Sequence, residues 1–579
     1  MSKQQLNGGV LAGEVFAKHG VKFIYTLCGG HISPILVGAE QQGIRVIDTR
    51  HEVTAVFAAD ATARLTGVPG VAAVTAGPGV TNTITAIKNA QMAQSPLVLI
   101  GGAAATLLKG RGALQDIDQI ALLKPIVKWA TACKTVREIV PKLEKAFQIA
   151  QNGVPGPVFV EIPVDLLYGE EVVKSWSLDS IKGSSLAARA TRAYVNLHTQ
   201  RTFAKAWQRR AQQPKTPRPT PPSDKQLGHI INALENAERP LLIIGSQAMV
   251  DAGSADDLAN AVRRMGIPVY LSGMARGLLG ISNLHMRHKR TKAMREADVI
   301  VLAGVPADFR MNYGQSIPRS ATYISINRSK ADLNLNRKPK IGLLADPGQT
   351  IRLLAARWRY PSVRFEAWRK RLQERNDARD AEIQSTADVE TEFVNPVRLC
   401  QQIEAVLPND SVLIGDGGDF VGTASYIVRP RKPLRWLDPG AFGTLGAGGG
   451  FALAAGLVYP DAEVWILYGD GSCGYSLAEF DTYTRHGVKL IAVVGNDASW
   501  AQIAREQVEI LGTALGTELV RTNYHIAAEG LGGKGLCVDE PSQVAPAIEQ
   551  AQALAADGNA VLLNVMIGST DFRKGSLSM

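Results

Sequence analysis

Residues 464–499 read VWILYGDGSCGYSLAEFDTYTRHGVKLIAVVGNDAS, and this stretch decides how the chain folds. An apolar run at 464–467 leads into a Gly-Asp-Gly turn, and a second apolar run at 490–494 leads into Gly495-Asn496-Asp497. Between the two runs, Tyr475 to His486 has a helix-like pattern. A strand, a crossover helix and a second strand form the unit from which parallel α/β sheets are built.

Polar side chains follow both of these apolar runs. Asp470 comes after the first run, and Asn496 and Asp497 follow the second, about 26 residues later. Loops after neighbouring parallel strands meet at the carboxyl edge of the sheet, so we expect these side chains to converge. Mg²⁺ binds such oxygen ligands and bridges them to phosphate, and the glycines beside Asp470 allow backbone N–H groups to approach a phosphate. The stretch therefore predicts a site for a divalent cation and a phosphate.

The same alternation of apolar runs and helix-like stretches covers most of the 579 residues. It divides the chain into three blocks separated by a basic, proline-rich segment and by a charged segment. The fold class that we predict is α/β, with three doubly wound parallel-sheet domains. The expected strands are 71–75, 97–100 and 158–162 in the first block, 241–244, 269–271, 299–302 and 323–326 in the second, and 412–414, 464–467 and 490–494 in the third.

Four ordered motifs resemble those of thiamine-diphosphate enzymes of the acetolactate synthase and 2-hydroxyacyl-CoA lyase group. Two of them resemble the segment with the cofactor-activating glutamate and the glycine-rich turn after it. The other two resemble the loop over the aminopyrimidine ring and the diphosphate-binding motif. Within the group, the second type of 2-hydroxyacyl-CoA lyase is the most similar. The motifs are Arg50-His51-Glu52 through Gly67, Thr75-Ala-Gly-Pro-Gly-Val-Thr-Asn82, Gly443-Thr-Leu-Gly-Ala-Gly-Gly-Gly-Phe-Ala452, and Gly469-Asp-Gly with Asn496.

The resemblance implies a pyrimidine-binding domain, a central nucleotide-binding-like domain and a diphosphate-binding domain, in that order. The central domain holds FAD or ADP in this group, so we expect one of them here, with candidate contacts in 245–247, 273–277, 303–304 and Arg310. The two cofactor-binding domains of the group face each other across subunits, which implies a homodimer or homotetramer. We place the domains at 1–175, 225–358 and 394–579, with a basic linker at 176–224 and a charged linker at 359–393.

The resemblance also assigns roles around the cofactor. Glu52 would hydrogen-bond N1′ of the aminopyrimidine and promote the imino tautomer that removes the C2 proton of the thiazolium. Leu445, beside Thr444, would hold the cofactor in its bent form. The residues implied around the diphosphate are Gly418, Asp419, Gly469, Gly471 and Ser472.

The metal ligands implied are Asp470, one side chain of the Asn motif and the carbonyl of Ser499. The motif usually reads Asn-Asn, whereas this chain has Asn496-Asp497. Ungapped alignment puts Asp497 at the coordinating position, and both side chains stay candidates.

Two further residues bear on the substrate. Cys28-Gly-Gly-His31 resembles the loop that points into the reaction centre, and its histidine resembles benzaldehyde lyase and the second type of 2-hydroxyacyl-CoA lyase. A histidine can shuttle the hydroxyl proton because its pKa lies near neutrality. The alternative for His31 is a loop histidine bonded to the backbone. Gln115 matches an active-site glutamine of these enzymes and would hydrogen-bond the substrate oxygen.

We therefore predict a thiamine-diphosphate- and Mg²⁺-dependent carbon–carbon lyase or carboligase. Its leading form cleaves a small-molecule 2-hydroxyacyl-CoA to an aldehyde and formyl-CoA. The alternatives are an acetolactate-synthase-like condensation of 2-oxo acids and an inactive cofactor-binding scaffold. The segment from Trp500 to Gln507 lacks the Gln-Trp pair that is common in acetolactate synthases, and the joint presence of Glu52, Asp470 and Asn496 argues against a scaffold.

The composition indicates a reducing compartment, and we expect a cytoplasmic protein. The five cysteines are scattered without a CxxC pair, which excludes a disulfide scaffold and a zinc ribbon. The N-terminus has no signal-peptide pattern, and no run of 18 or more apolar residues predicts a membrane span.

The excess of 63 basic over 53 acidic residues comes from one segment. Nine basic and no acidic residues lie between 181 and 220, so the charge does not indicate a nucleic-acid-binding globule. Tyr194, Leu197, Phe203 and Trp207 are interleaved with them at partly helical spacing. Two interpretations stay open for 185–212: a linker helix packed on its own protein, or a basic amphipathic helix on an anionic membrane or a partner.

Overall fold

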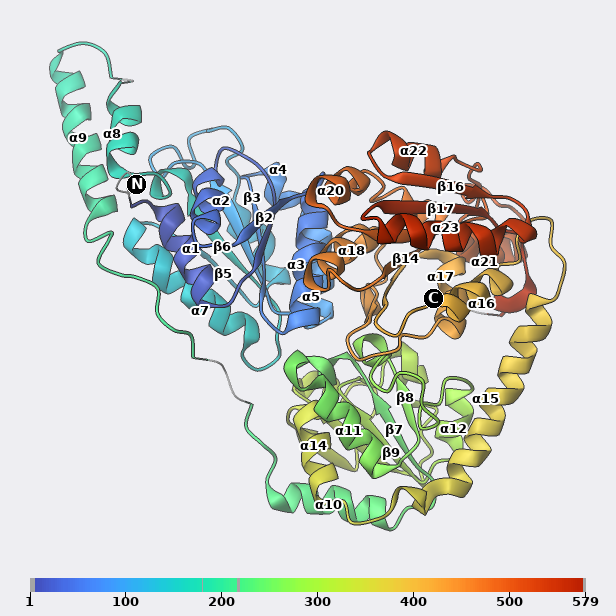
Figure 1. Ribbon diagram of the computed structural model, residues 1–579. Helices are drawn as coiled ribbons and strands as arrows, with labels where there is room; N and C mark the ends of the chain where they lie inside the picture. The colour runs from blue at the N-terminus through green and yellow to red at the C-terminus, as the bar shows by residue number, and fades with distance from the viewer. Residues whose placement is uncertain (1–5, 180, 216–218, 576–579) are drawn as a thin grey trace. The chain divides into compact units, whose positions relative to one another are not determined.

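The computed structural model describes residues 6–179, 181–215 and 219–575. It divides the chain into two compact units, of which the first contains residues 1–63 and 68–217 and the second contains residues 64–67 and 218–579. Three parallel sheets form the framework of these units, one in the first and two in the second (Figure 1). The predicted fold class is confirmed.

The first unit is built on a six-stranded sheet with the order β2-β1-β3-β4-β6-β5. Its central strands are buried along their whole length, because helices cover both faces of a parallel sheet. The strands are β1 (Phe23–Leu27), β2 (Arg45–Asp48), β3 (Gly70–Val74), β4 (Leu97–Ala103), β5 (Trp129–Ala132) and β6 (Pro157–Pro163). The helices are α1 (Gly8–Lys18), α2 (Ser33–Glu40), α3 (Glu52–Thr66), α4 (Pro78–Thr81), α5 (Ile84–Met92), α6 (Gln119–Leu123), α7 (Ile139–Gln151), α8 (Glu170–Asp179) and α9 (Leu186–Phe203).

The second unit begins with a five-stranded sheet, drawn in green in Figure 1, with the order β11-β10-β9-β7-β8. All four predicted strands are present, within a residue or two of their expected ends. The strands are β7 (Pro240–Ile244), β8 (Val269–Leu271), β9 (Val299–Ala303), β10 (Thr322–Asn327) and β11 (Ile341–Leu344). The helices are α10 (Asp224–Glu235), α11 (Ala255–Met265), α12 (Arg290–Glu296), α13 (Lys330–Leu333), α14 (Pro347–Arg357) and α15 (Glu366–Ala387).

The third sheet has six strands in the order β13-β12-β14-β15-β17-β16. Counted from its own first strand, this is the same order as in the first sheet. The strands are β12 (Val412–Asp416), β13 (Trp436–Leu437), β14 (Val464–Gly469), β15 (Leu490–Asn496), β16 (Lys534–Val538) and β17 (Ala560–Met566). The helices are α16 (Pro396–Val406), α17 (Gly418–Ile427), α18 (Ala447–Val458), α19 (Asp470–Cys473), α20 (Glu479–His486), α21 (Ala501–Leu511), α22 (Tyr524–Gly530) and α23 (Val544–Ala556).

One predicted helix is shorter than expected. The pattern predicts a helix from Tyr475 to His486, but α20 begins at Glu479. The residues before it form turns, in which the Tyr475 and Ser476 amides donate to Ser472 and Cys473. The polypeptide needs these turns to pass from the strand-end loop at Asp470 onto the face of the sheet.

Within the second unit, α15 links the two sheets. Trp368 and Leu372 pack in the core of the central sheet, whereas Ile383 and Ala387 pack in the core of the third. The loop after β8 adds a second connection, because the guanidinium of Arg276 lies 4.6 Å from the ring centroid of Trp436 and donates to the Ser425 carbonyl. No helix among the described residues has both the length and the apolar run needed to cross a bilayer.

Candidate functional site

The loops at the carboxyl edge of the third sheet surround a cavity of about 280 Å³. It lies beside the neighbouring strands β12 and β14, from which the chain continues to β13 on one side and to β15 on the other, and parallel α/β sheets bind ligands at such a point. Most of the predicted diphosphate and metal residues line it, whereas Thr444 and Asn496 are outside the lining set. The predicted residues that line it are Gly418, Asp419, Leu445, Gly469, Asp470, Gly471, Ser472, Asp497 and Ser499.

Glycines allow the walls of this cavity to approach one another. Gly417 follows β12 with φ of 68°, and a Cβ there would lie 2.2 Å from Cδ2 of Leu445. A Cβ on Gly471 would lie 2.4 Å from the Trp500 ring. Any side chain at these two positions would collide with Leu445 or Trp500, and glycine-rich loops of this kind allow a phosphate to approach backbone N–H groups.

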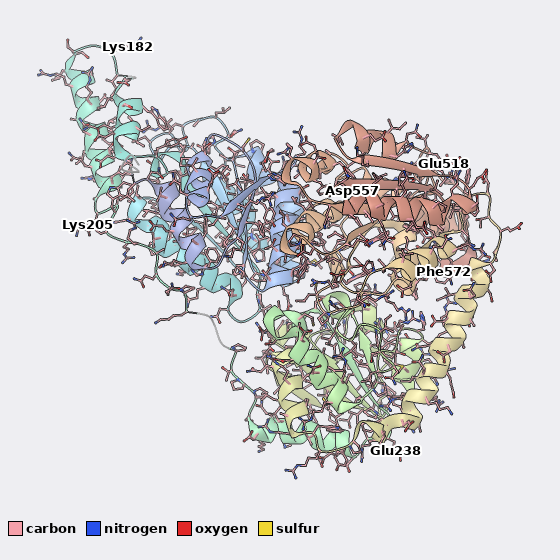
Figure 2. All side chains as sticks on the ribbon, in the orientation of Figure 1. Lys182, Lys205, Glu238, Glu518, Asp557 and Phe572 are labelled. Atoms are coloured by element: carbon pink, nitrogen blue, oxygen red, sulfur yellow. The ribbon has the colours of Figure 1, made fainter. Side chains whose placement is uncertain are left out.

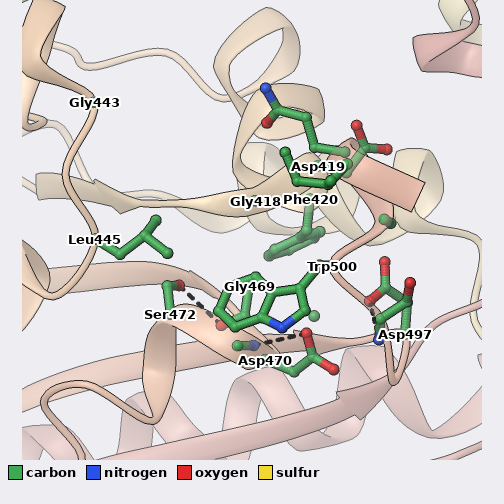
Figure 3. A pocket seen from close by; sticks show the side chains of 16 residues that line it. Gly418, Asp419, Phe420, Gly443, Leu445, Gly469, Asp470, Ser472, Asp497 and Trp500 are labelled. Atoms are coloured by element: carbon green, nitrogen blue, oxygen red, sulfur yellow. Dashed lines mark hydrogen bonds between the residues drawn. The ribbon is translucent and has the colours of Figure 1, made fainter. Parts of the chain in front are cut away.

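Two carboxylates of the cavity lie beside Trp500 in Figure 3. Asp470 accepts the Gly471 amide at 2.8 Å through Oδ1, while its Oδ2 is buried and has no hydrogen-bond partner. Asp497 accepts the Ser499 amide at 3.2 Å. Burial raises the pKa of Asp470, and burial together with the Asp470 carboxylate raises the pKa of Asp497 to about 7. A divalent cation would compensate this concentrated negative charge, so the residues fit the predicted metal.

Asn496 differs from Asp497 in how its side chain is held. It is fully buried at the end of β15, and its Nδ2 donates to the Thr522 carbonyl and to Asn564 Oδ1, each at 3.2 Å. Its Oδ1 is buried without a partner. Asn496 is therefore tied to β17, whereas Asp497 reaches the cavity.

The acidic side chains of the cavity do not by themselves form a complete metal site. In residues 6–179, 181–215 and 219–575, no three His, Cys, Asp or Glu side chains come together as a metal-binding group. A cation at Asp470 and Asp497 would need further oxygen ligands, and Mg²⁺ in proteins is typically bound by one or two carboxylates together with phosphate oxygens and waters.

Asp419 is the third acidic residue of the cavity, at the start of α17. It pairs with Arg505 of α21, and Nε of Arg573 lies 3.6 Å from its Oδ1. The prediction placed Asp419 around the diphosphate without identifying these arginines. Their positive charge offsets a carboxylate that would otherwise repel a phosphate.

Asp416 holds the loop that carries Leu445. It is fully buried at the end of β12 and accepts the amides of Gly446 at 3.1 Å and Gly448 at 2.7 Å. Burial raises its pKa to about 7. The prediction assigned no role to Asp416, because the loop that it clamps lies some thirty residues away in the chain.

In the first unit, the glycine-rich turn 75–82 brings the three predicted catalytic residues together. Oε2 of Glu52 accepts Asn82 Nδ2 at 3.0 Å, and Nδ1 of His31 lies 3.1 Å from Thr75 Oγ1. A Cβ on Gly77 would lie 2.7 Å from the Gln115 carbonyl oxygen. Glu52, His31 and Gln115 are therefore all neighbours of one turn.

These three residues lie in different surroundings. Glu52 is only 6% exposed at the start of α3. Burial lowers the pKa of His31, which favours the neutral form of its imidazole. Gln115 has φ of 62°, a left-handed conformation that costs about 1–2 kcal/mol and persists only where the surrounding structure holds it.

Gln119 holds this turn in place through hydrogen bonds, and the sequence analysis did not identify it. It is 1% exposed, accepts the Gly77 amide at 3.0 Å, and donates to the Gly102 carbonyl and to Glu161 Oε2. Lys109 pairs with the same Glu161. No sequence signal marks Gln119, since its partners are spread over three strand ends.

The residues of the central sheet that were predicted to contact a nucleotide bind other residues of the second unit. Gln247 donates to Asn327 and accepts the Arg328 amide, Arg310 pairs with Asp308, and the Arg276 guanidinium lies over the Trp436 ring. A Cβ on Gly245 would lie 2.6 Å from the Gly304 carbonyl oxygen, so the loops after β7 and β9 are in close contact. FAD or ADP at these residues stays a prediction.

Three family models match the chain. They describe the N-terminal TPP-binding, central and C-terminal TPP-binding domains of thiamine pyrophosphate enzymes, and they match residues 7–122, 227–354 and 416–565. Among curated relatives, 2-hydroxyacyl-CoA lyase 2 of Danio rerio is 49% identical over 99% of this chain and 93% of its own length. The protein of that name from Homo sapiens is 48% identical over 99% and 92%. A probable acetolactate synthase of Mycobacterium bovis is 33% identical over 97% and 96%.

The Asp416 clamp can be tested by substitution. Asp416→Ala leaves two buried amides without an acceptor, so we expect the free energy of unfolding to fall by about 2 kcal/mol or more. Affinity for thiamine diphosphate should fall about tenfold as well, because the 443–448 loop is no longer pre-ordered. Chemical denaturation and calorimetric titration measure the two effects. Asp557→Ala, at an exposed position after α23, is the matched control and should change neither. A wild-type affinity in Asp416→Ala would contradict this role.

Proposed function

Because the chain belongs to the thiamine pyrophosphate enzymes, we propose that it is a thiamine-diphosphate-dependent 2-hydroxyacyl-CoA lyase that cleaves its substrate to an aldehyde and formyl-CoA. The observation that carries the proposal is the turn 75–82, which gathers Glu52, His31 and Gln115 in the first unit. The relatives that share about half of its residues over nearly its whole length bear the same activity in their names.

The reaction breaks the bond between the carbonyl carbon and the hydroxyl-bearing carbon of the substrate. The hydroxyl loses its proton as the aldehyde forms, and the carbon left on CoA gains a proton to become formyl-CoA, so the atoms balance. Thiamine diphosphate, when bound, supplies an acidic carbon that can add to the substrate carbonyl and stabilise the electron pair of the broken bond.

In this proposal each residue of the first unit has one task. Glu52, oriented by Asn82, hydrogen-bonds the aminopyrimidine and holds the proton that this ring exchanges. His31, neutral and hydrogen-bonded to Thr75, accepts the hydroxyl proton of the substrate. The side-chain amide N–H of Gln115 donates a hydrogen bond to the substrate oxygen. Because the Glu52 side chain is largely buried, water has limited access to the proton that Glu52 holds.

In the second unit, the cavity of the third sheet would hold the diphosphate and Mg²⁺. We propose Asp470 and Asp497 as the side-chain ligands and the Ser499 carbonyl as a further ligand, with Asn496 as a positioning residue. Asp470 and Asp497 both line the cavity, whereas Asn496 does not, and this difference supports the choice. Gly418, Gly469, Gly471 and Ser472 would surround the phosphates, while Leu445 and Thr444 would contact the rest of the cofactor.

The proposal also covers the oligomeric state of the protein, its compartment and a further cofactor. Membership of the family supports a homodimer or homotetramer. The five cysteines are all free, which supports a reducing compartment such as the cytoplasm. FAD or ADP in the central domain stays part of the proposal as a bound nucleotide, and no step of the proposed reaction uses it. The acetolactate-synthase-like alternative retains the support of the more distant relative, and the experiment below separates it from the lyase.

Product analysis tests the proposal. The purified protein with thiamine diphosphate and Mg²⁺ is incubated separately with a 2-hydroxyacyl-CoA and with pyruvate, and the products are followed by mass spectrometry. We expect formyl-CoA and the aldehyde from the first substrate and no acetolactate from the second. Acetolactate from pyruvate alone would favour the synthase, and no product from either would overturn the proposal.

Two variants make this assay specific for the mechanism. Glu52→Gln should lower kcat by about 10²–10⁴-fold, since it removes the acid–base group while keeping the shape of the side chain. Its melting temperature should not change. Glu40→Gln, on the exposed end of α2, is the matched control and should be fully active. Formyl-CoA production at the wild-type rate in Glu52→Gln would exclude the mechanism.

The choice between Asp497 and Asn496 can be decided by metal titration. Asp497→Ala should weaken Mg²⁺ binding about a hundredfold or more, because it removes one of the two charged ligands, whereas Asp497→Asn keeps a ligand oxygen and should retain most of the affinity. Fluorescence of Trp500, which lines the cavity, reports Mg²⁺ binding at a fixed concentration of thiamine diphosphate. Unchanged Mg²⁺ affinity in Asp497→Ala would shift the assignment to Asn496.

A further inference from the structure

The basic segment of the first unit forms a helical hairpin of α8 and α9. The two helices lie side by side in Figure 1, and Figure 2 shows Lys182 at the turn between them and Lys205 at the base of α9. Arg192 closes the turn by donating to the carbonyls of Ile181 and Gly183 at 2.7 and 2.8 Å. The hairpin is thus an ordered element and not an extended linker.

The base of the hairpin is fixed to its own unit. Phe203 and Ala206 belong to the core of the first sheet. Nε2 of His198 lies 2.8 Å from Thr106 Oγ1, which also donates to the buried Asp165. Arg210 pairs with Glu14 of α1. The first interpretation of this segment, a helix packed on its own protein, therefore describes the base of α9.

The outer face of α9, unlike its base, carries exposed apolar side chains. Leu186, Ala190, Ala193 and Leu197 follow one another at intervals of four, three and four residues, which places them on one side of a helix. Leu186 is 84% exposed and Leu197 is 46% exposed, and the neighbouring Tyr194 is 57% exposed. The buried residues Ala188, Val195 and Thr199 lie on the opposite side. We call the exposed set of Leu186, Ala190, Ala193, Tyr194 and Leu197 the outer stripe.

Only positive charge flanks the outer stripe on its own helix. Arg189 and Arg201 lie beside it, and both are exposed. No acidic residue occurs between 181 and 220. The acidic residues of the hairpin, Glu170, Glu171 and Asp179, all belong to α8. Two copies of such a face would repel each other, so the charge disfavours a contact between two outer stripes and favours an anionic occupant.

An aromatic side chain favours lipid among the anionic occupants. Tyr194 lies on the stripe and is 57% exposed. It combines an apolar ring with a polar tip, and such side chains are favoured at the boundary between water and lipid. Basic residues and an interfacial aromatic ring beside an apolar stripe are found in helices that lie on a charged bilayer.

We propose that the outer stripe of α9 binds an anionic membrane surface, with Leu186 and Leu197 among the lipid headgroups and with Arg189, Arg201 and Lys182 facing their phosphates. The helix lies on the bilayer and does not cross it. This attachment is independent of the reaction proposed above, because none of these residues contributes to either cofactor-binding region.

Vesicle flotation of the full-length protein tests the proposal. Vesicles of phosphatidylcholine alone are compared with vesicles that also contain phosphatidylserine. We expect binding to the anionic vesicles alone. Binding should decrease as salt is raised from about 0.1 to 1 M, because the screening length falls from about 10 to 3 Å.

Matched variants locate the binding surface. Arg189→Gln with Arg201→Gln should lower the partition onto anionic vesicles about 30-fold, since each basic residue near such a surface contributes about fivefold. Leu186→Gln with Leu197→Gln should lower it at every salt concentration. The controls make comparable changes at exposed positions of the central sheet domain. Arg319→Gln with Lys338→Gln removes two positive charges and Ile281→Gln removes one exposed apolar side chain, and both should bind as the wild type does. Thermal melting and lyase activity verify folding.

Several results would overturn the proposal. These are no flotation of the wild type, equal flotation with neutral vesicles, or undiminished flotation of the hairpin variants. Light scattering that shows a smaller oligomer in the Leu186→Gln, Leu197→Gln variant would identify the outer stripe as a contact between copies of this chain. Binding of the wild type to polyglutamate but not to vesicles would identify an acidic protein as the occupant.

Discussion

The parallel pairing of the first strand with the third strand, in both cofactor-binding sheets, is the constraint on which the site depends. β1 pairs with β3, and β12 pairs with β14, so the loops after these strands leave the sheet at the same edge. In the first sheet these loops are the His31 loop and the turn 75–82. In the third sheet they are the Gly417–Asp419 loop and the Gly-Asp-Gly turn. One topology therefore builds two regions with different chemistry.

The two regions differ in how charge is compensated. Around the third sheet, three carboxylates share a cavity, and the arginines pair with Asp419, which leaves Asp470 and Asp497 in need of a cation. Around the first sheet, the partners of Glu52 and His31 are the neutral side chains of Asn82 and Thr75. The first arrangement suits a metal and a diphosphate, and the second suits the transfer of single protons.

The sequence was sufficient to predict features that depend on short stretches. The three sheets, the ten strands expected in them and the spacing between Asp470 and Asn496 follow from local apolar patterns and turn residues, whereas strands such as β1, β5 and β17 were not identified. Partners that are far apart in the chain could not be predicted, such as Asp416 with Gly446, Glu52 with Asn82, and Gln119 with Gly77. The start of α20 was wrong for a similar reason, because the turns after Asp470 depend on the direction in which the polypeptide must leave the strand. The proposed domain boundaries and residue roles stay predictions.

The most direct test of the account is a calorimetric titration of the wild-type protein with thiamine diphosphate, with Mg²⁺ present and with divalent cations removed by a chelator. The account predicts saturable binding that requires Mg²⁺, because the diphosphate must enter a cavity that already holds the carboxylates of Asp470 and Asp497. Equally tight binding without a divalent cation, or no binding in its presence, would contradict it.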